Sequence, residues 1–180
     1  MKNIEIEARS FVTKKQCKNL IKKLKKEARF VDSINEETVY FSGPGKDLRL
    51  RRDDENAFII LKEGRIHDSS REEIEIKFDR VEFKNIEELF KRLGYVDAVR
   101  WFRKRIIYKW GEIKILLDDT KGYGLIIELE KLGKTGKRRK IYKDLRNKLE
   151  SFGIKVTSKE EFDRKFEYYK KNWRKIIKYK

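Results

Sequence analysis

The sequence predicts an α+β fold, an eight-stranded antiparallel β-barrel with helices packed on its outside. Three observations favour this fold. Short strand-like runs carry charges at every second position, with mostly apolar residues between them, so each run has one charged face. About eight such segments follow one another through short connections, which favours antiparallel pairing, and eight strands can close a barrel. Further segments carry apolar residues at helical spacing and would cover the apolar side.

The alternating charges are the most informative of these observations. A single run of this kind is typical of an ordinary half-buried strand, whose charged face is wet. Several runs spread along the chain, with both signs present, instead suggest a charged interior that suits a divalent metal and a highly charged anion. The runs are residues 5–9, 49–51, 73–77, 103–105 and 128–130.

Composition narrows the partners. A length of 180 residues predicts one domain, residues 1–180. Charged residues make up 44% of the chain and the net charge is +17, so anionic partners are expected: nucleic acid, a phosphorylated small molecule or an acidic surface. One cysteine excludes an internal disulfide. The chain shows no hydrophobic signal segment and no membrane-spanning run, so a cytoplasmic protein without a membrane partner is expected.

The first half of the chain reads as strands around two helices. Strands are predicted at residues 3–12, 37–43, 47–52, 57–63 and 71–79, with a loop at 64–70. Thr13 and Gln16 form a capping box for the first helix, whose apolar stripe includes Cys17 as a buried structural residue. Asn85 with Glu88 is predicted to cap the second helix, and Gly94 ends it. His67, the single histidine, lies in the loop and is predicted to be solvated.

The second half continues the sheet and then becomes helical. Strands are predicted at 98–110, 112–119 and 124–131, followed by a basic, solvated linker at 131–143. Helices occupy about 138–178, and Ser158 with Glu161 caps the last one. An aromatic stripe along that helix is interpreted as core packing rather than as a dimer contact; its members are Phe162, Phe166, Tyr169 and Trp173.

Two pairs of carboxylates point to a metal. Glu5 and Glu7 share one strand face, as do Glu128 and Glu130, and the four converge if the first and last strands are neighbours. Clustered carboxylates repel one another unless cations intervene, and Mg²⁺ or Mn²⁺ prefers oxygen ligands. Asp118, near the following turn, could join them. Cross-strand salt bridges on a wet face are the alternative.

Cations fall on the same predicted face. Arginine forks grip phosphate oxygens in bidentate fashion, and a chain of phosphates needs several such contacts. Ion pairs with the carboxylates are the alternative for each one alone. The inward cations are Arg9, Arg49, Arg51, Lys62, Arg103 and Arg105, with Lys77 and Lys114 added by alternation.

These residues resemble the CYTH superfamily, the triphosphate tunnel metalloenzymes, which includes class IV adenylate cyclases, thiamine triphosphatases and inorganic triphosphatases. Residues 4–9 resemble its ExExK signature. Five further blocks follow in order, so the resemblance covers residues 3 to about 132: the arginine strand at 48–51, the lysine strand at 60–62, the R-x-E-x-E strand at 71–75, the basic strand at 103–108 and the closing strands from 117 to 130.

The resemblance implies a tunnel open at both ends that binds a triphosphate-bearing small molecule. It implies metal ligands at Glu5, Glu7, Glu128, Glu130 and Asp118. Substrate contacts would come from Arg9, Arg49, Arg51, Lys62, Arg71, Arg103, Arg105 and Lys114. Arg9 would also be catalytic, and Glu73 or Glu75 would assist as a base or as an orienting group. A departure concerns the signature lysine, which is Arg9 here; arginine keeps the charge but is bulkier and does not transfer protons.

Three functions follow from this resemblance. The leading hypothesis is metal-dependent hydrolysis of a triphosphate, such as tripolyphosphate, thiamine triphosphate or a nucleoside triphosphate. The second is an adenylate cyclase that converts ATP to cyclic AMP and pyrophosphate. The short connection between Tyr40 and Leu48 argues modestly against it. The third is a non-catalytic module that binds triphosphate or RNA; nucleic acid is less favoured, because the patterned cations share a face with carboxylates. A monomer or a homodimer is compatible with the sequence.

Overall fold

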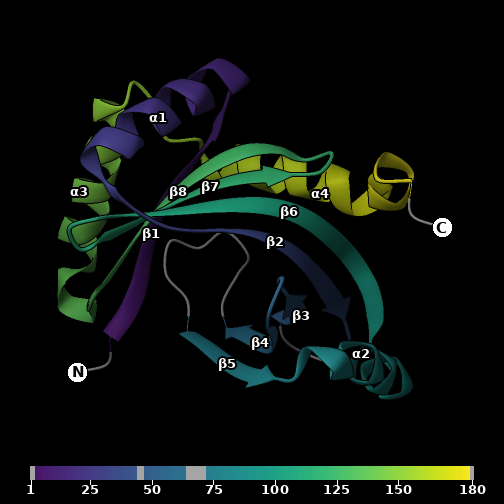
Figure 1. The fold of residues 1–180 in the computed structure, drawn as a ribbon. Helices are drawn as coiled ribbons and strands as arrows, with labels where there is room; N and C mark the ends of the chain where they lie inside the picture. The colour runs from purple at the N-terminus through teal and green to yellow at the C-terminus, as the bar shows by residue number, and fades with distance from the viewer. Residues whose placement is uncertain (1–2, 44–46, 64–71, 179–180) are drawn as a thin grey trace.

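One antiparallel sheet dominates the computed structural model, which describes residues 3–43, 47–63 and 72–178 (Figure 1). The predicted α+β fold with eight antiparallel strands is confirmed, and the strand order is β1-β8-β7-β6-β2-β3-β4-β5. The strands are β1 (Asn3–Val12), β2 (Arg29–Ser42), β3 (Asp47–Arg52), β4 (Ala57–Glu63), β5 (Glu72–Phe78), β6 (Val96–Trp110), β7 (Ile113–Thr120) and β8 (Gly124–Lys134).

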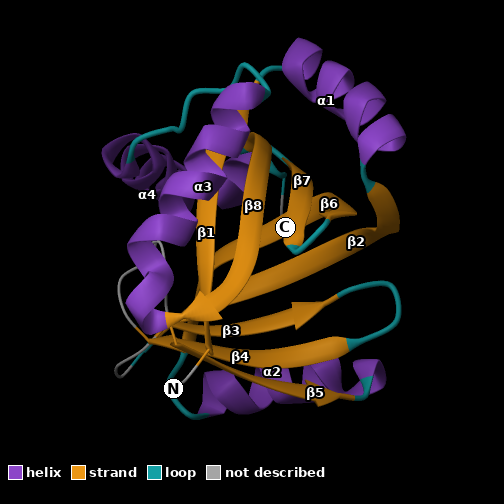
Figure 2. Cartoon of the chain, turned by 90° about the vertical axis from the view of Figure 1, so that its left-hand side faces the viewer, coloured by secondary structure: helices purple, strands orange, loops and turns teal. Residues whose placement is uncertain are grey.

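The sheet curls into a half-barrel (Figure 2). Strands β1 and β5 are at the two ends of the strand order, and no ladder joins them within the described residues. They nevertheless face each other across the curl, because Lys62 in β4 and Glu73 in β5 both act on the pKa of Glu5 in β1. The concave face is therefore the one that carries the alternating charges.

Three helices cover the convex face. Helices α1 (Lys14–Glu27) and α3 (Arg138–Ser151) pack over β1, β8 and β7, and their core includes Ile6, Leu24, Ile127 and Leu145. Helix α2 (Phe83–Arg92) packs Phe83 over β2 to β4, and a short 3-10 turn, η1 (Arg80–Glu82), precedes it. Burial of these apolar side chains supplies the main stabilisation of each layer.

The last helix, α4 (Lys159–Ile176), packs differently from the prediction that all helices lie outside. Its aromatic stripe is core, as predicted, and lies in one cluster with Val99 and Trp101 of β6. In register, Trp101 faces Thr38 and Val99 faces Tyr40, which in turn faces Arg49. Cross-strand partners share a face, so α4 covers one end of the concave side, along β6 to β8 (Figure 1).

The local predictions fared unevenly. Thr13 and Gln16 form the predicted capping box, and Gly94 follows the end of α2 at a φ of 89°. The predicted cap at Asn85 is wrong, because α2 begins two residues earlier and Asn85 instead donates to Glu82. Cys17 is half-buried rather than buried.

Two segments were assigned differently from the structure. Strand β2 begins at Arg29, eight residues before the predicted start at 37. The basic stretch 131–143 is not a linker: it holds the end of β8, a 3-10 turn η2 (Thr135–Lys137) and the start of α3. The loop with His67 lies outside the described residues. Among the described helices, none is long and apolar enough to cross a membrane.

Candidate active site

Strand register gathers the predicted charges on the concave face. Glu5, Glu7 and Arg9 alternate along β1. Across the β1–β8 ladder, Glu7 faces Glu130 and Arg9 faces Glu128. The first and last strands are hydrogen-bonded neighbours, so the condition for convergence of the carboxylates is met.

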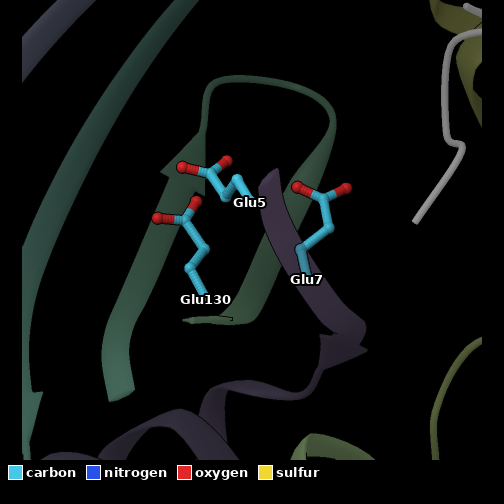
Figure 3. A group of neighbouring side chains, drawn as sticks. All are labelled: Glu5, Glu7 and Glu130. Atoms are coloured by element: carbon cyan, nitrogen blue, oxygen red, sulfur yellow. The ribbon is translucent and has the colours of Figure 1, made fainter. Parts of the chain in front are cut away.

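Three carboxylates form a compact cluster. One oxygen from each of Glu5, Glu7 and Glu130 lies within 4.8 Å of the others, and Figure 3 shows the Glu5 and Glu130 carboxylates side by side. Burial, reinforced by Glu130, raises the pKa of Glu5 to about 7. Burial also raises the pKa of Glu7 to about 7, against the opposing effect of Arg9, and it raises the pKa of Glu130. Such a set of destabilised oxygens fits a hard divalent cation.

The other two predicted metal ligands lie against arginines. Asp118 accepts hydrogen bonds from Arg105 Nε and Nη2, both at 2.7 Å, and from Arg103 Nη1 at 3.1 Å. Burial would raise the pKa of Asp118, but Arg105 and Arg103 outweigh it and lower that pKa. Glu128 lies 3.5 Å from Arg105 Nη2 and 3.6 Å from Arg9 Nη1. Their role as metal ligands stays a prediction.

The predicted substrate cations from β3 and β4 pair with carboxylates on the same face. Arg49 binds Asp47, and its guanidinium lies 4.3 Å from the ring centre of Tyr40. Lys62 Nζ lies 2.5 Å from a Glu73 oxygen, and Arg51 Nη2 lies 2.8 Å from a Glu75 oxygen. The site is therefore a lattice of opposite charges, in which each cation is held by a carboxylate until an anion competes for it.

Two further predicted contacts are less central. Lys114 lies 3.3 Å from Glu130 and is half-exposed, so it reaches the metal cluster from β7. Lys77 is exposed near the end of β5. Arg71 lies outside the described residues.

Glu36 is the site residue that the sequence reasoning missed. It is only 5% exposed, and its carboxylate lies 2.8 Å from Arg103 Nε, 3.5 Å from Arg105 Nε and 3.6 Å from Arg51 Nε. It faces Arg103 across the β2–β6 ladder. The stretch 29–36 lacks clear apolar alternation, so the strand was predicted to begin just after this residue. Extending the alternation of Thr38 and Tyr40 by one step would have found it.

The chain belongs to the CYTH family. The CYTH domain model matches residues 3–164, which span all eight strands and the start of α4. The resemblance inferred from the sequence blocks is thereby confirmed.

Relatives agree with this assignment. A protein of Methanocaldococcus jannaschii named "Putative adenylate cyclase" is 31% identical over 162 residues, which cover 84% of this chain and 90% of that one. The PH1012 protein of Pyrococcus horikoshii is 28% identical with a TM-score of 0.70, over 85% of this chain and 94% of that one. A Hippeastrum protein, "Putative adenylyl cyclase HpAC1", described with a dominant triphosphatase activity, shares the fold at 18% identity and a TM-score of 0.65, over 91% and 95% of the chains.

Proposed function

We propose that this protein is a metal-dependent triphosphatase that hydrolyses a triphosphate-bearing small molecule on the concave face. The observation that carries the proposal is the cluster of Glu5, Glu7 and Glu130 beside a row of arginines on one curled sheet. The cluster offers oxygen ligands for Mg²⁺ or Mn²⁺, and the arginines offer bidentate grips for phosphate oxygens. The activity described for the Hippeastrum protein agrees with this proposal.

The arginines bind and orient the triphosphate. Arg51, Arg103 and Arg105 converge on Glu36, so their forks already point to a common region before substrate arrives. An incoming phosphate chain would take over these donors and add the charge-assisted bonds that strengthen as charge develops during hydrolysis. Arg49 and Lys62 extend the same surface from β3 and β4.

The carboxylates act on the metal and on water. A bound Mg²⁺ or Mn²⁺ would supply Lewis-acid polarisation of phosphoryl oxygens. Glu5, Glu7 and Glu130 would hold it, and binding would displace the proton that their raised pKa values favour. Glu73 and Glu75 are tied to Lys62 and Arg51, so they orient these cations, and either carboxylate could accept a proton from the attacking water.

Arg9 takes an electrostatic role in this scheme. Its Nη1 lies 3.2 Å from Glu7 and 3.6 Å from Glu128, which places a fixed positive charge between the metal cluster and the arginine row. Arginine cannot act as a proton donor at neutral pH. Arg9 therefore stabilises the phosphate charge in place of the lysine found in the family signature.

A cyclase is the second candidate, favoured by the name of the Methanocaldococcus relative. It would use the same charged face, with the ribose 3′-hydroxyl of ATP as nucleophile in place of water. The two activities differ in their products, orthophosphate against cyclic AMP.

A product assay tests the proposal. The protein is incubated with Mn²⁺ and, separately, tripolyphosphate, thiamine triphosphate or ATP, and both products are followed. The wild type is expected to release orthophosphate, and Glu130→Gln is expected to lose at least 100-fold in rate. Glu112→Gln is the matched control, because Glu112 is exposed on the β6–β7 turn and pairs with Lys131. Cyclic AMP alone would move the assignment to cyclase, and no turnover with intact triphosphate binding would leave a non-catalytic binder.

A further inference from the structure

Helix α4 covers the end of the concave face that lies beyond Arg9. Phe162 stacks on Phe11 with ring centres 4.6 Å apart, and Phe11 is two residues beyond Arg9 on the same strand face. The Arg9 guanidinium lies 4.6 Å from the centre of the Phe162 ring. Phe166 lies 6.1 Å from Trp101 and 6.2 Å from Tyr40. Aromatic rings from α4 therefore form a wall across this end.

Buried polar groups without hydrogen-bond partners gather in front of this wall. They include the Thr38 and Thr120 hydroxyls, the Trp101 indole Nε1 and the Tyr123 hydroxyl, none of which has a partner among the described residues. Thr38 is 4% exposed, Thr120 1% and Trp101 8%. Folded proteins rarely leave buried donors unsatisfied, because each one carries a desolvation penalty.

These groups are neighbours in the sheet. Thr38 faces Trp101 across the β2–β6 ladder and Arg51 across the β2–β3 ladder, and Thr120 faces Arg103. Directly opposed residues have Cβ atoms about 5 Å apart. The rings of Trp101 and Tyr123 lie 4.7 Å apart, and Tyr123 contacts Phe11 at 5.4 Å between ring centres. The unpaired donors thus line one region between the arginine row and α4.

The charges facing this region are mixed. Arg9 contributes a further buried nitrogen, Nη2, that has no hydrogen-bond partner within the described residues. Arg103 and Arg105 are largely matched by Glu36 and Asp118, and Glu128 lies close to Arg9. Neutral donors rather than excess positive charge therefore distinguish the region from the rest of the concave face.

We propose that this region is a terminal-phosphoryl subsite. Thr38, Trp101, Thr120 and Tyr123 would donate hydrogen bonds to the end of the triphosphate chain, and α4 would block any group beyond it. The inference rests on the proposed function and narrows its substrate class to triphosphates with a free terminal phosphate. Substrates esterified at both ends, and internal phosphates of long chains, would not fit.

Direct binding of tripolyphosphate, without metal, tests the subsite independently of turnover. Calorimetry compares tripolyphosphate with diadenosine triphosphate, whose two ends are both esterified, and with inorganic phosphate. The wild type is expected to bind tripolyphosphate at least tenfold more tightly than the doubly esterified ligand. If the wild type binds inorganic phosphate as tightly as tripolyphosphate, the subsite belongs to free phosphate and the terminal-group proposal is overturned.

Two isosteric variants supply the decisive comparison. Thr38→Val and Tyr123→Phe each remove one unpaired hydroxyl, so the melting temperature should stay the same or rise. Each is expected to weaken tripolyphosphate binding about tenfold and to leave diadenosine triphosphate binding unchanged. Thr135→Val and Tyr168→Phe are the controls, because both positions are exposed.

The outcomes separate the two proposals. If both variants bind tripolyphosphate as the wild type does, or if they weaken both ligands equally, the subsite is refuted while the proposed function stands. If the wild type binds no tripolyphosphate at all, the proposed function itself fails, which no subsite variant can cause.

Discussion

At the residue scale, the site keeps its carboxylates in an unfavourable state. Glu5, Glu7 and Glu130 are held together by paired strands, and burial and mutual repulsion raise all three pKa values. The remaining charges on this face are matched by opposite charges. Stability is thus sacrificed at the cluster that a cation would relieve, as is typical of functional sites.

Glu5→Gln should stabilise the metal-free protein at alkaline pH. A carboxyl group whose pKa is raised from 4.5 to about 7 in the folded state stabilises the fold fully below pH 4.5. That contribution is lost as the pH rises through 7. At pH 8 in EDTA, the variant should gain about 1 kcal/mol in free energy of unfolding after solvent screening, and the gain should fade by pH 5.

The same variant should lose the rise in melting temperature that Mn²⁺ gives the wild type, because one oxygen ligand is removed. Glu112→Gln serves again as the control. A Glu5→Gln variant that is less stable than the wild type at pH 8, or that keeps the full response to Mn²⁺, contradicts this account of the cluster.

Arg9 tests whether its charge or its chemistry matters. Arg9→Lys keeps the charge beside Glu7 and Glu128, so kcat should stay within about threefold of the wild type. Arg9→Met removes the charge and should lower kcat about 100-fold. Initial rates of phosphate release measure both. A tenfold or larger rise in kcat for Arg9→Lys would instead show that the family lysine does chemistry that arginine cannot.

At the element scale, a buried ion network fastens α2 to the sheet. Arg100 in β6 pairs with Glu37 of β2, with Asp97 of β6 and with Glu87 of α2. Glu37 and Glu36 are adjacent, so one faces this network on the convex side and the other faces the concave site. Neither network was predicted, because pairing partners so far apart in sequence are visible only once the strand register is known.

Glu87→Gln should destabilise this element and reduce its acid sensitivity. Burial opposes ionisation of Glu87, but Lys91, Arg100 and Lys84 outweigh it and lower its pKa to about 2. A depressed pKa contributes stability above pH 4.5 that is lost as the pH falls toward 2. The variant should lose about 3 kcal/mol at pH 7, because a buried arginine loses a partner.

Urea unfolding at pH 7 and pH 3 measures this effect. The difference between Glu87→Gln and the wild type should shrink at pH 3. Glu88→Gln is the matched control, because Glu88 is exposed on the same helix and pairs only at the surface with Arg92. Equal behaviour of the two variants at both pH values argues against a structural role for the network.

At the scale of the whole molecule, alternation predicted most of the site and little of its closure. Glu5, Glu7, Arg9 and Glu130 were placed on one face because a strand period of two requires it. Strand pairing, which set Glu36 among the arginines, depends on long-range register that no local pattern contains. The position of α4 was mispredicted for a related reason: an aromatic stripe shows that a helix is buried but not which face of the sheet it covers.

The most direct measurement is a crystal structure with Mn²⁺ and tripolyphosphate, with the metal located by its anomalous scattering. The account predicts Mn²⁺ bound by Glu5, Glu7 and Glu130, with phosphate oxygens taken up by Arg51, Arg103 and Arg105. Metal bound elsewhere, or tripolyphosphate on the outer surface with the concave ion pairs intact, would contradict it.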